Sequence, residues 1–249
     1  MRAAVLREYR ADLSLETVPD PICEPDGVVL KVLACGICRS DWHGWVGEHA
    51  KVRPGNILGH EYCGEVVEAG PLARWKIGDR VIAPFILSCG ECPECRQGHS
   101  TTCRAPRVPG FGEPGAYAEY VSAPHAHNLA RLPDSLTPAL AAGLGCRVTT
   151  AFHALTGRAG LQTGEWLAVH GTGGVGLSLL LIGRALGARV VVVDLVPERL
   201  AHALSLGAEA ALDARDGEVA ARIVALTGGG AHVSVEALGI EATTNASIE

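Results

Sequence analysis

A short segment near the N-terminus gathers side chains that can do chemistry. Within six positions it carries a thiol, a hydroxyl, a carboxylate and an imidazole, on Cys38, Ser40, Asp41 and His43. His60 and Glu61 add a second imidazole and a second carboxylate further along. Thiolates and imidazoles bind zinc, and hydroxyls and imidazoles transfer protons. Cys38 and His60 lack the spacing of a local zinc motif, so the residues alone also allow a core cysteine and a hydrogen-bonded histidine.

A second group of cysteines has a spacing that predicts a structural metal site. Cys89, Cys92, Cys95 and Cys103 are separated by two, two and seven residues. Four thiolates close a tetrahedral shell around zinc and leave no open position, so such a site stabilises a loop and does no chemistry. An iron–sulfur cluster also uses the first two spacings, but the last spacing and the single group favour zinc.

A glycine-rich loop in the second half predicts a dinucleotide site. Residues 171–176 read Gly-Thr-Gly-Gly-Val-Gly, between an apolar run and a helical pattern. Glycines there let the backbone approach a pyrophosphate at a helix N-terminus. Asp194 ends the next apolar run, where a carboxylate accepts from ribose hydroxyls and repels a 2′-phosphate, which favours NAD over NADP. The expected cofactor-binding residues of the loop are Gly171, Gly173, Gly174, Val175 and Gly176.

The pattern of elements changes near the middle of the chain and predicts a mixed α/β protein with two domains, residues 1–150 and 151–249. The first half has short β-like segments broken by glycine and proline, which is typical of a small barrel. Thr137 and Pro138 have the residue types that begin a helix. Beyond them, strands alternate with helices, which predicts a parallel, doubly wound sheet. We expect strands at 28–32, 62–68, 80–84, 166–170, 189–194, 210–212 and 232–237, and helices at 175–186, 197–206 and 218–227.

The composition limits the classes of partner. Of the 249 residues, 48% are hydrophobic and 19% charged, so the chain can form a full core. Its net charge of −6 argues against nucleic acid as a main partner. The apolar runs are too short to cross a membrane, and the N-terminal segment lacks the apolar run of a signal peptide. We therefore expect a cytoplasmic protein, in which a count of nine cysteines points to metal binding or catalysis rather than to disulfides, with Cys23, Cys35 and Cys63 as core residues.

The motifs taken together resemble the zinc-dependent alcohol dehydrogenases of the medium-chain dehydrogenase/reductase superfamily. They occur in the family's order and cover nearly all of the chain. The resemblance implies an N-terminal GroES-like catalytic barrel followed by a Rossmann domain. The matching pieces are residues 36–43, 59–61 and 78–81, the four-cysteine group, Gly145-Cys146, and the glycine loop with Asp194.

The resemblance also implies a catalytic zinc. Its ligands would be Cys38, His60 and Cys146, with a fourth position open to water or substrate. The chain would thus hold two zinc ions, one catalytic and one structural. An alcohol bound at the catalytic ion loses its proton more easily, and hydride can then leave its carbon. Ser40 would take that proton, pass it through the ribose of the cofactor, and His43 would release it to solvent.

Supporting residues follow from the same resemblance. Asp41 would accept from the free ring nitrogen of His60, and Glu61 would lie close behind the zinc. Arg39 would bind the pyrophosphate of the cofactor, and Thr150 would contact the nicotinamide.

The chain is shorter than the family pattern. A doubly wound dinucleotide domain has about six strands, and we expect fewer here, so the Rossmann domain should be incomplete. The full-length family implies a homo-oligomer formed through the missing sheet edge. The main hypothesis is hydride transfer between a primary or secondary alcohol and NAD, giving an aldehyde or a ketone. Two alternatives stay open: a zinc-free quinone or enoyl reductase, and a truncated, non-catalytic protein that binds zinc and nucleotide.

Overall fold

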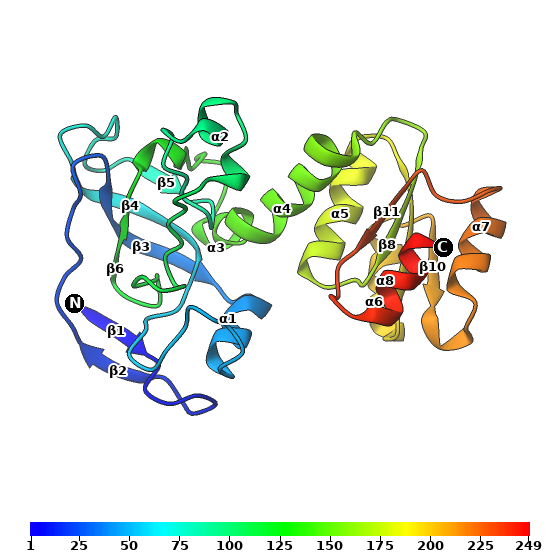
Figure 1. Cartoon of the computed structure of the whole chain (residues 1–249), viewed down its shortest axis with the longest axis horizontal. Helices are drawn as coiled ribbons and strands as arrows, with labels where there is room; N and C mark the ends of the chain where they lie inside the picture. Colours follow the sequence, from blue (N-terminus) through cyan, green and yellow to red (C-terminus); the bar gives the residue numbers. More distant parts are fainter. The chain divides into compact units, whose positions relative to one another are not determined.

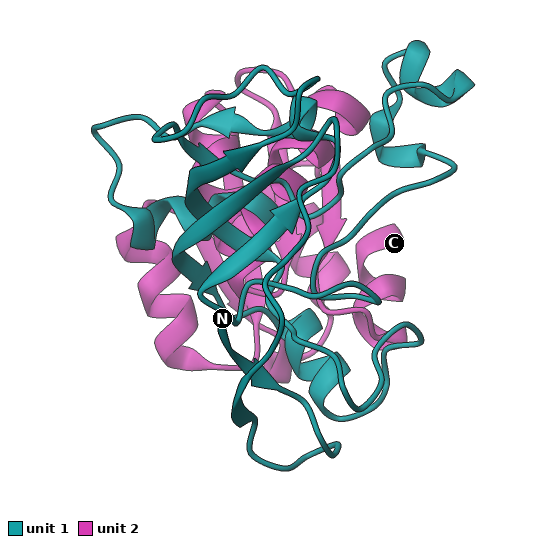
Figure 2. Cartoon of the chain, turned by 90° about the vertical axis from the view of Figure 1, so that its left-hand side faces the viewer, with its two compact units in different colours: residues 1–146 teal, residues 147–249 magenta.

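The computed structural model describes residues 1–249. They form two compact units, residues 1–146 and 147–249 (Figures 1 and 2). The boundary between the units falls inside the short π-helical segment η3 (Leu144–Val148). The predicted boundary, after residue 150, divides the chain by function and stays a prediction. No helix combines the length and the apolar character needed to span a membrane.

The first unit is built on a five-stranded antiparallel sheet with the order β6-β3-β4-β5-β7. Its buried face carries apolar side chains such as Leu30, Val66 and Val81, which pack with the ring of Tyr62. The strands of this unit are β1 (Arg2–Val5), β2 (Ser14–Thr17), β3 (Val28–Gly36), β4 (Glu61–Ala69), β5 (Arg80–Ile82), β6 (Tyr120–Ala123) and β7 (Ala130–Arg131).

The pairing of β3 with β4 determines where the chemistry-bearing residues lie. Gly36 at the end of β3 stands opposite Glu61 at the start of β4. The residues that follow β3 and precede β4, among them Cys38 and His60, therefore meet at one end of this strand pair. A Cβ atom on Gly36 would lie 2.4 Å from Oε2 of Glu61, so a side chain at this position would displace the Glu61 carboxylate.

Short helices join the strands of this unit. Helix α1 begins directly after Cys38, whose backbone N–H donates to the Asp41 carboxylate at 2.9 Å, as in a capping box. Helix α3 begins as predicted, with Pro138 in its first position and the Thr137 hydroxyl accepting from the N–H of Leu140. The helices are α1 (Arg39–Trp45), α2 (Pro93–Arg96), η1 (Ser100–Thr102), η2 (Ala126–Asn128) and α3 (Pro138–Ala142).

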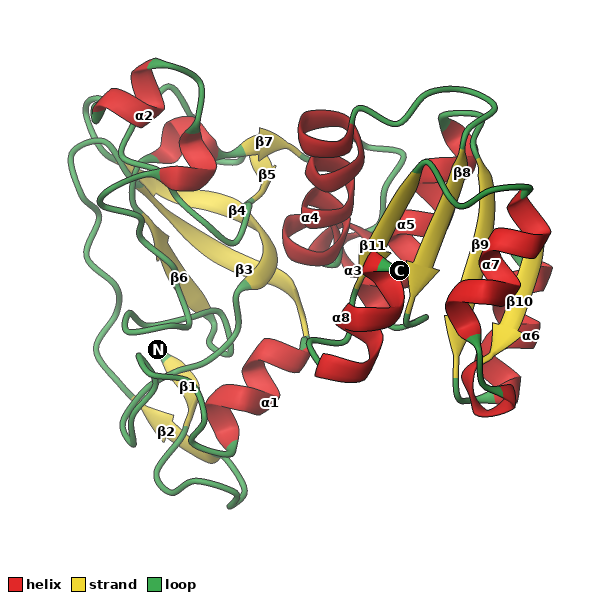
Figure 3. Ribbon diagram, turned by 45° about the vertical axis from the view of Figure 1, so that its right-hand side comes forward, coloured by secondary structure: helices red, strands yellow, loops and turns green.

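The second unit contains a parallel four-stranded sheet with the order β10-β9-β8-β11. Helices cover both of its faces (Figure 3). Leu167 and Val169 of β8 pack with helix α5, whereas Trp166 and Ala168 pack on the opposite face with Ile223 of helix α7. The strands are β8 (Trp166–His170), β9 (Arg189–Asp194), β10 (Ala210–Asp213) and β11 (Val233–Glu236).

Helices α5, α6 and α7 agree with the three predicted helices of this unit, whereas the helical segments at 149–159, 214–216 and 241–248 were not predicted. Helix α8 consists mostly of small and polar residues, and none of them is buried. Its sequence therefore lacks the apolar periodicity that predicts a helix. The helices are α4 (Thr149–Phe152), η4 (His153–Ala159), α5 (Gly174–Ala185), α6 (Pro197–Ser205), η5 (Ala214–Asp216), α7 (Val219–Thr227) and α8 (Glu241–Ile248).

Candidate metal and cofactor sites

The first unit contains a cluster of four potential metal ligands. Ligand atoms of Cys38, His60, Glu61 and Cys146 all lie within 4.8 Å of one another. Cys38 precedes α1, His60 directly precedes β4, Glu61 begins that strand, and Cys146 lies in η3. His60 and Glu61 are 1% and 0% exposed. The fold thus brings together the three predicted ligands of the catalytic zinc and adds a buried carboxylate.

The imidazole of His60 is held in one orientation by Asp41. Nδ1 of His60 lies 3.1 Å from Oδ1 of Asp41, and the same oxygen accepts from the backbone N–H of Gly59 at 3.1 Å. Nε2 of His60 is buried without a hydrogen-bond partner. A buried ring nitrogen that faces two thiols and has no donor or acceptor beside it fits a metal ligand.

The charges within this cluster also suit a metal. The hydrogen bond from Cys146 and the neighbouring His60 hold the pKa of Cys38 well below its usual range, although burial opposes this. Burial lowers the pKa of His60, but the hydrogen bond to Asp41 and the neighbouring Cys38 thiol outweigh that effect and raise it to about 9. These shifts favour a proton on the imidazole beside an ionised thiol. Zinc requires the neutral imidazole, so its binding should release that proton.

Replacing Asp41 with asparagine should weaken metal binding at this cluster. The amide lacks the charge that makes the His60 imidazole a stronger ligand, so we expect zinc affinity to fall by about 10-fold to 100-fold. Competition with a chromophoric chelator measures this, and the four-cysteine site serves as an internal reference. Asp26→Asn is the matched control, because Asp26 pairs with His125 at 2.6 Å outside the cluster. Equal affinities in the two variants would contradict the role given to Asp41.

Ser40 and His43 lie on helix α1 at different distances from the cluster. The Ser40 hydroxyl is 3.9 Å from the sulfur of Cys38. His43 lies near the surface, where its Nδ1 is 2.7 Å from Oε2 of Glu48, with the two side chains 42% and 53% exposed. No direct hydrogen bond joins Ser40 to His43. The sequence did not single out Glu48, since a carboxylate five residues after a histidine is not a motif.

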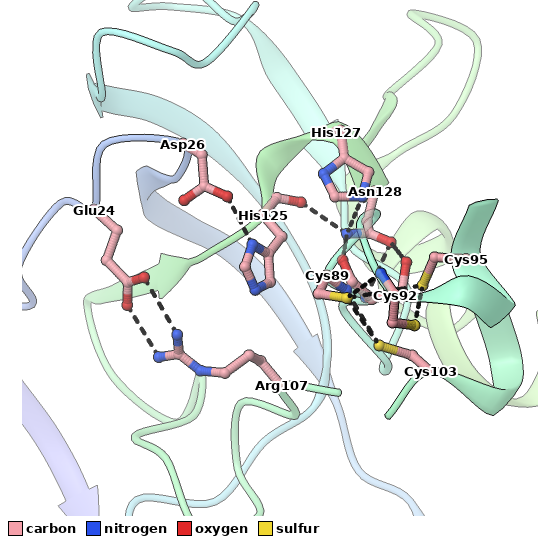
Figure 4. Close-up of polar contacts among 11 residues, drawn as sticks. Glu24, Asp26, Cys89, Cys92, Cys95, Cys103, Arg107, His125, His127 and Asn128 are labelled. Carbon is pink, nitrogen blue, oxygen red and sulfur yellow. Dashed lines mark hydrogen bonds and ion pairs between the residues drawn. The ribbon is translucent and has the colours of Figure 1, made fainter. Parts of the chain in front are cut away.

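The four-cysteine group forms a second ligand cluster in the first unit (Figure 4). The sulfur atoms of Cys92 and Cys95 are 3.4 Å apart, those of Cys89 and Cys103 3.5 Å, and those of Cys89 and Cys95 4.0 Å. Four sulfurs around one zinc would be about 3.8 Å apart, given the usual Zn–S bond. All these cysteines are free, and Cys92 and Pro93 start helix α2 within the loop. The geometry fits a closed structural zinc site.

Asn128 connects this cysteine loop to the sheet of the same unit (Figure 4). Its Nδ2 donates to the carbonyl oxygens of Ser88 and His125 at 2.9 and 2.8 Å. Its Oδ1 accepts from the N–H and the hydroxyl of Ser88 at 3.1 and 2.8 Å. These bonds fix Ser88, the residue directly before Cys89. Nothing in the sequence indicated them. His125 pairs with Asp26 and belongs to neither ligand cluster.

In the second unit, the glycine loop joins β8 to α5. Gly171 has a φ of 97°, and Gly173 caps the helix that begins at Gly174. A Cβ atom on Gly176 would lie 1.8 Å from the carbonyl oxygen of Gly171, so the loop requires glycine at that position. The close turn places the first turn of α5, with its free N–H groups, at the carboxyl end of β8, where a pyrophosphate can bind.

Asp194 ends β9 and is bonded to this loop. One oxygen accepts from the N–H and the hydroxyl of Thr172 at 2.8 and 2.6 Å, and the other accepts from the N–H groups of Leu195 and Val196 at 2.8 and 3.1 Å. Burial raises the pKa of Asp194, but these hydrogen bonds outweigh it and hold the pKa below its usual range. Asp194 is thus a fixed anion, 7% exposed, and Thr172 is a partner that the sequence did not reveal.

The two remaining predicted cofactor residues lie at the surface of their units. Arg39 is exposed, and its guanidinium carbon lies 3.7 Å from the centre of the Trp42 ring. Thr150, in α4, is exposed as well. Their roles toward the cofactor stay predictions.

Comparisons with known proteins show which family this chain is similar to. Residues 24–134 match the alcohol dehydrogenase GroES-like domain, and residues 174–249 match the zinc-binding dehydrogenase domain. Two alcohol dehydrogenases of Geobacillus stearothermophilus are 39% and 35% identical, over 86% and 94% of this chain. The chain spans 63% and 70% of their lengths. The structure of alcohol dehydrogenase TADH from Thermus sp. ATN1 is 34% identical with a TM-score of 0.93, over 100% of this chain and 73% of that one.

These matches confirm the predicted fold, a GroES-like domain with a Rossmann-like parallel sheet. The zinc-binding dehydrogenase match, the two sets of metal-ligating side chains and the glycine loop support zinc and NAD as cofactors. The chain belongs to the zinc-dependent alcohol dehydrogenase family of the medium-chain dehydrogenase/reductase superfamily.

Proposed function

We propose that this protein transfers a hydride between a primary or secondary alcohol and NAD, giving an aldehyde or a ketone. The observation that carries the proposal is the cluster of Cys38, His60 and Cys146, in a chain that also has a glycine loop closed by Asp194. Zinc bound by two thiolates and an imidazole would act as a Lewis acid and make the alcohol easier to deprotonate.

The residues of the cluster have separate tasks in this proposal. Asp41 keeps the imidazole of His60 turned toward the metal position, because it occupies the other ring nitrogen. Glu61 supplies a fourth donor within 4.8 Å of the others. We predicted that the fourth position on the metal is open. The Glu61 carboxylate is within reach of that position, so the alcohol would bind as the carboxylate moves aside.

The proton of the alcohol leaves through helix α1 in this proposal. Ser40, which is near the cluster, would accept the proton and pass it to the ribose of the cofactor, and His43 at the surface would release it to solvent. Glu48 accepts from Nδ1 of His43 and so favours the tautomer whose Nε2 is free to take the proton. Arg39 binds the pyrophosphate and Thr150 contacts the nicotinamide.

NAD should be preferred over NADP because Asp194 is a buried anion at the end of β9. A 2′-phosphate beside it would cost several kcal/mol, so we expect kcat/KM for NAD to exceed that for NADP by at least about a hundredfold. Asp194→Asn removes the charge and should reduce this ratio by about tenfold. Asp213→Asn is the control, because Asp213 ends the neighbouring strand β10 and pairs with Arg215 instead. The same loss of preference in both variants would refute the assignment.

An alcohol panel with NAD and NADP, run beside zinc quantification, tests the whole proposal. We expect turnover with NAD and about two zinc ions per chain. Turnover with NADPH alone and without metal would favour the zinc-free reductase. Tight NADH binding without turnover of any alcohol would favour a non-catalytic zinc- and nucleotide-binding protein.

A further inference from the structure

Helix α1 places Arg39 against an aromatic ring. Arg39, Trp42 and His43 are three and four residues apart and therefore share one face of the helix. The guanidinium carbon of Arg39 lies 3.7 Å from the centre of the Trp42 ring. No ion pair or hydrogen bond with another residue holds the Arg39 side chain, so this stacking is its specific contact.

The indole of Trp42 has aromatic and apolar neighbours of its own. Its ring meets that of His43 edge to face, with centroids 5.1 Å apart and an interplanar angle of 78°. Leu13, Ile37 and Trp45 line the same apolar hollow as Trp42. Although Trp42 is 37% exposed, these neighbours limit the orientations that its ring can take.

Stacking and anion binding use different parts of a guanidinium. The planar face of the group rests on the aromatic ring, whereas its N–H groups point outward in the plane and can donate to two oxygens of a phosphate. An arginine that is already stacked loses less conformational entropy when it binds an anion than a freely moving one does.

We propose that Trp42 is a positioning residue for the cofactor: its indole holds the Arg39 guanidinium in place so that the N–H groups can bind the pyrophosphate of the dinucleotide. This inference rests on the proposed function, because Arg39 is placed on the pyrophosphate there. In this role Trp42 affects cofactor binding through Arg39, which a residue that only packs in the core or lines the substrate pocket would not do.

Calorimetric titration with NADH tests the inference through two substitutions of similar bulk. Trp42→Leu keeps an apolar side chain but removes the aromatic face, and the Kd for NADH should rise about threefold to fivefold, as for an exposed cation–π contact. Trp42→Phe keeps an aromatic face, and the Kd should change by less than about twofold. The KM for NAD should rise in Trp42→Leu while kcat stays the same.

A double-mutant cycle with Arg39→Gln separates positioning from general packing. Once the guanidinium is absent, Trp42→Leu should have no further effect on the Kd for NADH. AMP, which lacks the pyrophosphate, should bind equally well to the wild type and to Trp42→Leu. Trp45→Leu is the control on the same helix, because Trp45 donates to the carbonyl oxygen of Ala11 at 2.7 Å and does not contact Arg39; the Kd should stay unchanged.

The outcomes distinguish the inference from the proposed function. Equal Kd values for Trp42→Leu and Trp42→Phe, or an effect of Trp42→Leu that persists beside Arg39→Gln, would overturn the role of Trp42 alone. A wild-type protein that binds neither NADH nor AMP would overturn the cofactor site, and the inference with it.

Discussion

Replacing Cys38 with serine is expected to abolish alcohol oxidation while NADH binding persists. Serine is a poor zinc ligand at neutral pH, so the cluster would keep His60 and Cys146 with a weakened hold on the metal. Losing the Lewis acid removes several kcal/mol of transition-state stabilisation, and kcat/KM should fall by at least about a thousandfold. Zinc should fall from about two ions per chain to about one, since the four-cysteine site is untouched. The helix should remain, because serine is a good N-cap residue for α1.

The control for this variant is Cys35→Ser, three residues earlier. The Cys35 thiol donates to the carbonyl oxygen of Gly36 and lies outside the ligand cluster. Burial raises the pKa of this thiol to about 12. We expect Cys35→Ser to keep both zinc ions and most of the activity. Metal analysis, initial rates and NADH titration measure all three properties; a Cys38→Ser protein that still reduced NAD with alcohol would contradict the assignment.

The second large effect is expected for Gly176→Ala in the glycine loop. The new methyl group would lie 1.8 Å from the carbonyl oxygen of Gly171, so either the loop or helix α5 must shift. Overpacking of this kind should lower the free energy of unfolding by about 3 kcal/mol. The N–H groups at the start of α5 would no longer converge on one point, and NADH affinity should fall by at least about a hundredfold.

Gly173→Ala is the matched control for the loop. A Cβ atom at Gly173 meets nothing within 4 Å, and the position has a φ of −75°, so the variant should melt like the wild type. It should nevertheless bind NADH more weakly, because the methyl group would occupy space that the pyrophosphate approaches. Thermal melts and calorimetric titration of both variants separate folding from binding. Wild-type affinity in Gly176→Ala would show that the tight turn is not needed.

The elements of the second unit were the most predictable from the sequence. The predicted bounds of Trp166–His170 and Arg189–Asp194 coincide with β8 and β9. Both strands are buried on two faces and read as continuous apolar runs bounded by turns. In the first unit, the strand expected at 28–32 continues to Gly36 through register shifts near Leu30 and Ala34. Such irregularities depend on the partner strand, which local propensity does not describe.

The two candidate metal sites were predictable to different degrees, because one is built from residues close in sequence and the other from residues that only the fold brings together. The four cysteines of the structural site lie close in sequence, so spacing alone indicated them. Cys38, His60 and Cys146 are distant in sequence, and the residues alone left Cys38 and His60 ambiguous. The pairing of β3 with β4 brings the first two together, and Cys146 comes from a helical segment far along the chain.

Three hydrogen-bond partners of the site residues were not predicted. Glu48, Thr172 and Asn128 contact His43, Asp194 and the cysteine loop through hydrogen bonds. Each of these residues is of a common polar type in an ordinary position of the sequence. Their contacts follow from how separate segments meet, which a single sequence does not show.

X-ray absorption at the zinc edge tests the central claim most directly, since it counts the sulfur and nitrogen or oxygen ligands of the bound metal. Averaged over one site with four thiolates and one with two, the wild type should show about three sulfur ligands and one nitrogen or oxygen ligand per zinc. Cys38→Ser should shift the average toward four sulfurs, because the structural site alone would keep its metal. A wild-type average of four sulfurs with a single zinc per chain would contradict the catalytic metal site.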